Sequence, residues 1–209
     1  MVKIKICGIT NEDDAKVAVA AGTDALGFIM YRKSPRFVEA AVVKSIVAGL
    51  PPFVLPVGVF VNEEPDRVRT LMDECGLALA QLHGDETALY CQDLGRPVMK
   101  ALRLQDRGTF LALAEFQGRA NVRGFLIDAF SDQAYGGTGQ TVDWTLAREV
   151  AQSMPVVLAG GLTPVNVAEA ITRVRPYGVD VSSGVELSPG KKDHEKVKAF
   201  INAARLVPA

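Results

Sequence analysis

Eight short apolar segments recur at regular intervals along this sequence, and they constrain the fold more than any other feature. All are rich in Val, Ile, Leu and Phe. They lie at Val2–Ile9, Ala25–Met30, Phe53–Phe60, Leu77–His83, Val98–Leu104, Gly124–Phe130, Val156–Leu162 and Val179–Val185. Near-continuous apolar segments of this length are typical of parallel strands whose two faces are both covered.

Segments with helical spacing separate the apolar segments. The expected helices include Ala15–Ala21, Val68–Cys75, Val165–Val174 and a last helix from a cap at Asp193 through Ala204. Acidic residues or a proline open these segments, and a glycine such as Gly76 ends them, as helix start and stop signals do.

The repeated strand–helix alternation predicts a parallel sheet with right-handed crossovers, closed into a (β/α)8 TIM barrel. We expect one barrel domain over residues 1–209, because no linker or low-complexity segment interrupts the pattern. An open doubly wound sheet is the alternative. Eight regular units without a second domain favour the closed form.

The charge balance argues against nucleic acid as a partner. The chain has 23 basic and 24 acidic residues, a formal net charge of −1, and no basic block of the kind that tracks phosphates. Prolines and glycines interrupt the two uncharged stretches, residues 45–62 and 151–168, so neither predicts a membrane span. The first residues also lack the apolar region of a secretory signal.

The cysteine and histidine content argues against a metal site. Three cysteines without metal-ligand spacing and two histidines are a poor basis for zinc. Unpaired thiols fit a reducing compartment, so we expect a cytoplasmic protein.

Two reactive side chains are expected at the carboxyl ends of strands, where barrels of this type place their active sites. Cys7 ends the first apolar segment and is a candidate base or nucleophile; the alternative is a small buried apolar residue. Asp128 lies near the end of the sixth and is a candidate general acid; the alternative is a cap for the loop that follows.

Other polar residues follow the strands. Arg36 comes after the second strand, and its guanidinium is suited to bind a carboxylate; the alternative is a solvated side chain in a loop. For Arg32 and Lys33 the solvated loop is the expected interpretation. His83 ends the fourth apolar segment as either a catalytic base or a structural histidine. For Asp180 we expect a buried structural role.

Glycine-rich segments follow the sixth strand and end the seventh and eighth, and together they predict a phosphate site. Glycine lets backbone N–H groups approach a phosphate closely, and barrels often bind phosphate with the loops after strands seven and eight. Each segment alone is also compatible with a plain turn. The expected substrate-binding residues are Gly137, Gly160, Gly161, Ser183 and Gly184.

Taken together, these motifs closely resemble the phosphoribosylanthranilate isomerase family of tryptophan biosynthesis. The matching segments, in chain order, are residues 5–10, 27–28, 34–36, 57–60, 81–84, 128, 136–139, 143–144, 158–162 and 180–186. The opening Cys motif combined with Gln-Leu-His-Gly and Ser-Ser-Gly-Val-Glu is specific, whereas Gly-Gly occurs in many barrels. One departure is Gln140-Thr141-Val142, where the family often has a basic residue and Phe.

The resemblance implies an Amadori rearrangement without cofactor or metal. N-(5-phospho-β-D-ribosyl)anthranilate becomes 1-(2-carboxyphenylamino)-1-deoxy-D-ribulose 5-phosphate. The resemblance implies that Asp128 is the general acid, that Cys7 is the general base and that Arg36 binds the anthranilate carboxylate. The backbones of Gly160-Gly161 and Ser183-Gly184 bind the phosphate.

Two other functions remain open from the sequence. One is a related isomerase of aminoimidazole-carboxamide ribotide, which is expected to use two aspartates, so Cys7 argues against it. The other is a non-catalytic barrel that binds a phospho-ligand, and the presence of both Cys7 and Asp128 argues against that. The expected partner is a small phosphorylated substrate, and the sequence does not decide between a monomer and a homodimer.

Overall fold

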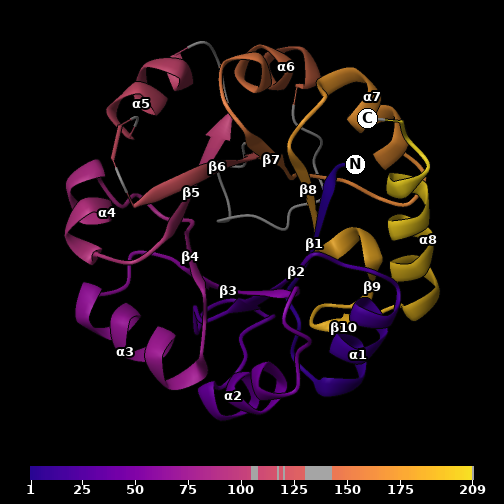
Figure 1. Ribbon diagram of the computed structural model, residues 1–209, viewed down its shortest axis with the longest axis horizontal. Helices are drawn as coiled ribbons and strands as arrows, with labels where there is room; N and C mark the ends of the chain where they lie inside the picture. The colour runs from indigo at the N-terminus through magenta and orange to yellow at the C-terminus, as the bar shows by residue number, and fades with distance from the viewer. Residues whose placement is uncertain (105–107, 117, 120, 130–142, 209) are drawn as a thin grey trace.

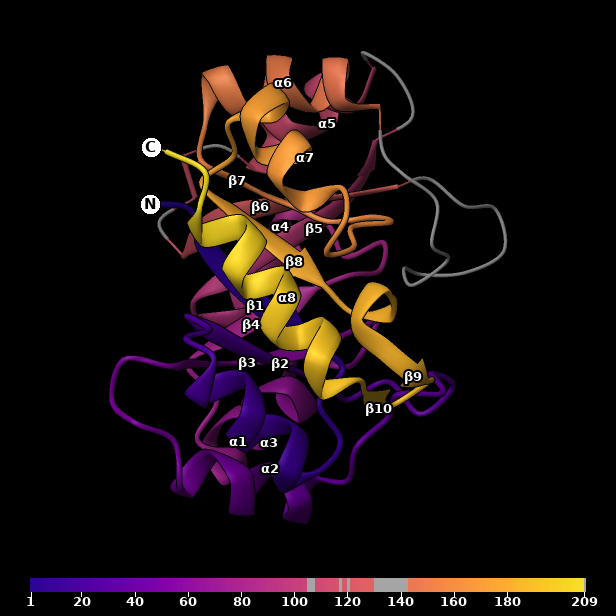
Figure 2. The ribbon, with the colours of Figure 1, turned by 90° about the vertical axis from the view of Figure 1, so that its right-hand side faces the viewer.

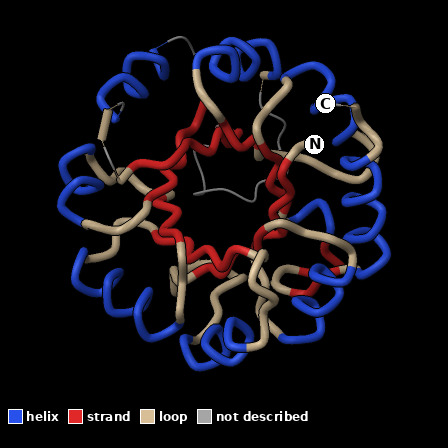
Figure 3. Tube along the Cα trace, in the orientation of Figure 1, coloured by secondary structure: helices blue, strands red, loops and turns tan. Residues whose placement is uncertain are grey.

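The computed structural model describes residues 1–104, 108–116, 118–119, 121–129 and 143–208. Within these residues, eight parallel strands pair in chain order, and β8 pairs with β1 to close a barrel. Eight α-helices surround the strands (Figures 1 and 3). The predicted (β/α)8 TIM barrel is confirmed, and the open doubly wound sheet is excluded.

The strands and helices follow the apolar and helical segments of the sequence. The barrel strands are β1 (Lys3–Cys7), β2 (Ala25–Ile29), β3 (Leu55–Phe60), β4 (Leu79–Leu82), β5 (Val98–Leu104), β6 (Val122–Ala129), β7 (Val156–Leu158) and β8 (Gly178–Val181). The helices are α1 (Glu12–Ala20), α2 (Ala40–Ala48), α3 (Pro65–Cys75), α4 (Ala88–Leu94), α5 (Gly108–Phe116), α6 (Trp144–Ser153), α7 (Val167–Val174) and α8 (His194–Arg205). Each helix in the described part of the chain is too short or too polar to cross a membrane.

Two strands, β7 and β8, end four residues before their apolar segments do. β7 ends at Leu158, because Gly160 and Gly161 have φ angles of +83° and +63°, a left-handed backbone that favours glycine and cannot continue a strand. β8 ends at Val181 and is followed by a short 3-10 helix, η1 (Ser183–Val185). The expectation of longer strands is therefore wrong. Gly160-Gly161 and Ser183-Gly184 therefore lie after β7 and β8, and not at the ends of these strands.

Helix starts follow the sequence signals where a side chain caps the helix. Asn11 caps α1 and Asp193 caps α8, each by accepting a hydrogen bond from a backbone N–H of the first turn. The exception is α7, which begins at Val167, later than expected. There the Asn166 side chain accepts a bond from the Thr163 N–H and holds the preceding residues in a turn.

Strand side chains alternate between the layer under the helices and the barrel interior. The large outer cluster contains Ile4 and Ile6 of β1 and Phe125 and Ile127 of β6. The small inner cluster consists of Met99, Ala101, Leu126 and Ala159. By this alternation, Lys5 and Cys7 of β1 face the barrel interior, and so does Asp128 of β6.

After η1 the chain forms a hairpin, β9 (Glu186–Ser188) and β10 (Lys191–Lys192), which the sequence does not predict. Figure 2 shows the hairpin at the end of the barrel towards which β8 points, whereas both chain termini lie at the opposite end. The hairpin therefore brings Glu186 and Lys192 to the end where the expected active-site residues lie.

Candidate active site

Cys7 is the last residue of β1, and it is buried, with 5% of its surface exposed. Its neighbour across the strands is Gly27 of β2. A Cβ atom on Gly27 would lie 2.7 Å from Cys7 Sγ and 3.0 Å from Lys5 Nζ, so the thiol and the ammonium cover the same glycine. Burial raises the pKa of the Cys7 thiol, and the Lys5 ammonium opposes part of this rise.

Asp128 lies near the end of β6 and is also buried, with 6% of its surface exposed. His83, which directly follows β4, places its Nε2 3.2 Å from Asp128 Oδ2. This is an ion-pair distance, but its geometry is not that of a hydrogen bond. The other ring nitrogen, Nδ1, lies 2.9 Å from Gln81 Nε2, so the imidazole is held between Gln81 and the aspartate.

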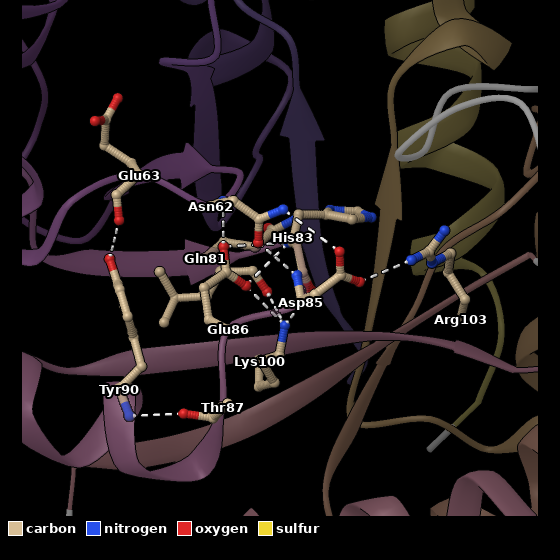
Figure 4. Close-up of polar contacts among 12 residues, drawn as sticks. Asn62, Glu63, Gln81, His83, Asp85, Glu86, Thr87, Tyr90, Lys100 and Arg103 are labelled. Carbon is tan, nitrogen blue, oxygen red and sulfur yellow. Dashed lines mark hydrogen bonds and ion pairs between the residues drawn. The ribbon is translucent and has the colours of Figure 1, made fainter.

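A buried ion pair fixes the segment that carries His83 (Figure 4). Lys100 Nζ donates to Glu86 Oε2 at 2.8 Å and to the carbonyl oxygens of Leu82 and Gly84, on either side of His83. Glu86 in turn accepts bonds from two backbone N–H groups. The Lys100 and Glu86 side chains are 2% and 1% exposed. The histidine therefore extends from a segment that is held on both sides.

Arg36, in the loop after β2, is held by Glu186 of the hairpin. Arg36 Nε and Nη2 donate to the two carboxylate oxygens at 2.9 and 2.8 Å, and Lys192 Nζ donates to the same carboxylate at 2.9 Å. Burial opposes ionisation of Glu186, but these two cations outweigh it and lower its pKa. None of these bonds uses Nη1 of Arg36, so one edge of the guanidinium is left for another anion.

The Arg36 cluster lies beside the Cys7 site. A Cβ atom on Gly8, the residue after Cys7, would lie 3.0 Å from Arg36 Cδ and 3.5 Å from Lys192 Nζ. The Lys192 side chain is fully buried, and burial lowers its pKa despite the attraction of Glu186. Two cations and one carboxylate thus meet next to the thiol.

The candidate phosphate site lies in the loops after β7 and β8. Within the described residues, no backbone bond is donated by the N–H groups of Gly160, Gly161, Ser183 and Gly184. A Cβ atom on Gly184 would overlap the carbonyl oxygen of Leu162, so these loops pack backbone against backbone. Uncommitted N–H groups in glycine-rich loops are suited to bind phosphate oxygens. Gly137, which was also expected here, lies outside the described residues.

The solvated surroundings expected for Arg32 and Lys33 are confirmed. Arg32 and Lys33 are exposed, in contrast to Arg36. Cys75 and Cys91 lie on helices α3 and α4, away from strand ends. In the described residues, no group of three or more His, Cys, Asp or Glu side chains is arranged to hold a metal ion.

Asp180 is buried, as expected, whereas the sequence did not single out Lys5, Glu186 and Lys192. Lys5 Nζ donates to Asp180 Oδ1 at 2.9 Å inside the barrel, and Glu186 and Lys192 join Arg36 in the hairpin. One signal for Lys5 was available: a lysine two residues before Cys7 in a strand faces the same side as the cysteine.

The arrangement is suited to two proton transfers on one anionic ligand. A thiol on β1 and a carboxyl group on β6 face the interior at the same end of the barrel. Arg36 and the loops after β7 and β8 offer anion-binding groups at that end. An acid and a base placed in this way can protonate one atom of a bound molecule and deprotonate another.

Comparison with known proteins points to one family. The family model described as "N-(5'phosphoribosyl)anthranilate (PRA) isomerase" matches residues 4–203. The N-(5'-phosphoribosyl)anthranilate isomerase of Trichlorobacter lovleyi is 50% identical over 206 residues, which cover 98% of each chain. The crystal structure of phosphoribosyl anthranilate isomerase from Thermotoga maritima superimposes with a TM-score of 0.90 at 40% identity, over 98% of this chain and 99% of that one.

A further similar structure contains a ligand. It is a phosphoribosyl anthranilate isomerase in complex with reduced 1-(o-carboxyphenylamino)-1-deoxyribulose 5-phosphate, with a TM-score of 0.86 and 40% identity over 98% of this chain and 99% of that chain. That ligand carries a phosphate and a carboxylate, the two anionic groups for which the present site has separate candidate binding groups.

Proposed function

This chain belongs to the N-(5'-phosphoribosyl)anthranilate isomerase family, and from this premise we propose that Asp128 and Cys7 are the acid and the base of its reaction. The enzyme isomerises phosphoribosylanthranilate in tryptophan biosynthesis by an Amadori rearrangement. The observation that carries the residue assignment is the inward orientation of Cys7 and Asp128 at the same end of the barrel.

The acid step opens the sugar ring. Asp128 donates a proton to the ribose ring oxygen, and the anilino nitrogen supplies the electron pair that breaks the bond between this oxygen and C1. The product is a Schiff-base cation. His83, 3.2 Å from the carboxylate, keeps Asp128 oriented towards the interior.

The base step removes the hydrogen from C2. The Schiff-base cation makes this hydrogen acidic, so a thiolate is a strong enough base to remove it. Cys7 takes up this proton, and the resulting enolamine tautomerises to the ketone by losing the proton on O2 and gaining one at C1. Because burial raises the pKa of the thiol, we expect kcat/KM to rise with pH above neutrality.

The anionic ends of the substrate fix its orientation between the two groups. We assign the phosphate to the N–H groups of Gly160, Gly161, Ser183 and Gly184. The anthranilate carboxylate binds the edge of Arg36 that Glu186 leaves open. Three free cysteines support a reducing location, and we place the enzyme in the cytoplasm.

Replacement of each proton-transfer group tests the assignment. Asp128→Asn and Cys7→Ser are each expected to lower kcat by at least about a hundredfold, the usual contribution of a general acid or base. Turnover is followed by the loss of substrate fluorescence with purified protein, and far-UV circular dichroism verifies the fold.

Matched variants separate the chemistry from the substitution. Cys75→Ser on α3 and Asp73→Asn, whose carboxylate pairs with Arg96 at the surface, make the same chemical changes elsewhere and are expected to keep wild-type turnover. A Cys7→Ser or Asp128→Asn protein with near-normal kcat would show that the role given to that residue is wrong.

A further inference from the structure

The barrel interior next to Cys7 contains an ion pair where barrels usually place branched apolar side chains. Lys5 and Asp180 lie opposite each other in the β1–β8 pairing, and Lys5 Nζ is 2.9 Å from Asp180 Oδ1. Their side chains are only 6% and 9% exposed. Withdrawing two charges from water costs several kcal/mol for each, roughly, and the attraction between them does not always return it. Stability alone therefore does not account for this pair.

The ion pair lies beside the thiol. Lys5 and Cys7 are two residues apart on β1 and face the same way, and Lys5 Nζ and Cys7 Sγ both cover Gly27. Lys5 Nζ donates a hydrogen bond to Asp180 Oδ1, and its ammonium attracts the Cys7 thiolate. Burial alone would lower the pKa of Lys5, but Asp180 and Cys7 outweigh burial and raise it, so Lys5 stays a cation.

Two other cations near Cys7 are bound to a carboxylate. Lys192 of β10 attracts the thiolate, but its ammonium is bound to Glu186. The Arg36 guanidinium over Gly8 is bound to the same carboxylate. The neighbouring strand β2 contributes no titratable side chain. Among the described residues, Lys5 and Asp180 are thus the charges that act on the sulfur most directly.

We propose that Lys5 and Asp180 are positioning residues for the base step, Lys5 by stabilising the Cys7 thiolate and Asp180 by limiting that stabilisation. The proposal rests on the assignment of Cys7 as the base. Both effects are needed, because a thiolate bound only to an ammonium is abundant but weakly basic, whereas a thiol without a cation is rarely ionised. Catalysis by a base is most efficient between these limits.

The test is the titration of Cys7 in variants of the ion pair. Thiolate absorbance at 240 nm is measured against pH for each variant and for the same variant with Cys7→Ser, and the difference isolates Cys7. Lys5→Met is expected to shift this titration to higher pH, and Asp180→Asn to lower pH, each by about one unit, as neighbouring charges do. The pH dependence of kcat/KM is expected to shift with it.

Two further variants make the test sharp. The double variant Lys5→Met/Asp180→Asn removes the whole pair and leaves no unpaired charge. Its Cys7 thiol is expected to titrate at a pH between those of the wild type and of Lys5→Met, because the ammonium acts on Cys7 more strongly than the carboxylate does. Lys3→Met removes an ammonium from the same strand, but Lys3 is half-exposed and paired with Asp24, so the titration is expected to stay at the wild-type pH.

The outcomes distinguish this inference from the proposed function. If the single variants shift the titration in the same direction, or not at all, the role of the ion pair is wrong. If the titration shifts in the expected order but the kcat/KM profile does not follow, the ion pair does control the thiol, and the assignment of Cys7 as the base is wrong. A purely structural role would lower activity at every pH and leave the titration unmoved.

Discussion

The close approach of the loops after β7 and β8 gives a specific prediction for Gly184→Ala. The added methyl group would overlap the carbonyl oxygen of Leu162 and lie 3.0 Å from its carbonyl carbon and 3.3 Å from Thr163 Cα. Backbone atoms cannot rotate away as a side chain can, so one loop must move by more than about 1 Å for non-bonded contacts to reach their usual separation of about 3.5 Å. A displacement of this size at a substrate-positioning site can lower kcat/KM by roughly a hundredfold.

The kinetic assay identifies the site that is damaged. With Gly184→Ala we expect kcat/KM to fall by about a hundredfold and inhibition by inorganic phosphate to weaken in parallel. Gly49→Ala is the matched control, because Gly49 has a φ of −98° and a Cβ atom there would approach no atom more closely than Ile46 O at 3.7 Å. Wild-type kcat/KM and wild-type phosphate inhibition in Gly184→Ala would refute the assignment of phosphate to this loop.

Two predictions concern stability. Lys100→Met is expected to lower the free energy of unfolding by about 3–5 kcal/mol, because the Glu86 carboxylate is left buried without its cation. Adding Glu86→Gln to this variant is expected to restore most of the lost stability. Equal urea midpoints for the wild type, the single variant and the double variant would contradict this. Burial would raise the pKa of Asp24, but bonds from Lys3, the Ile4 N–H and Arg205 lower it. Its stabilisation is therefore present above the unfolded-state pKa and is lost as the pH falls through the folded value. We expect Asp24→Asn to cost about 1 kcal/mol at pH 7, and its thermal unfolding curve to converge with that of the wild type in acid.

The parts of the fold that depend on local sequence were predictable. β5 has the bounds that its apolar segment predicts, and the caps Asn11 and Asp193 mark helix starts. The same local logic finds Cys7 and Asp128, because an inward reactive side chain at the end of a barrel strand needs no knowledge of distant contacts.

The parts that depend on register and close packing were not predictable. Lys5 and Asp180 are separated by 175 positions, and Arg36 and Glu186 by 150, so each pair becomes visible only when the barrel is closed and the strands are aligned. The hairpin of β9 and β10 is too short for its periodicity to be recognised. The early end of β7 depends on two positive φ angles, and a Gly-Gly sequence is compatible with other turns as well.

The two sides of the barrel interior differ in polarity, and this difference bears on why the proposed acid and base are not interchangeable. Beneath Asp128, the strands β5 to β7 contribute the apolar cluster around Leu126, whereas beneath Cys7 the strands β8 and β1 contribute Asp180 and Lys5. The base step needs a charged sulfur, and a cation within reach favours that form. A thiol transferred to position 128 would lie over apolar side chains and beside the His83 imidazole, without the Lys5–Asp180 ion pair beneath it. On the proposal above, the ion pair under β1, and not the thiol alone, makes this side of the barrel suitable for a base.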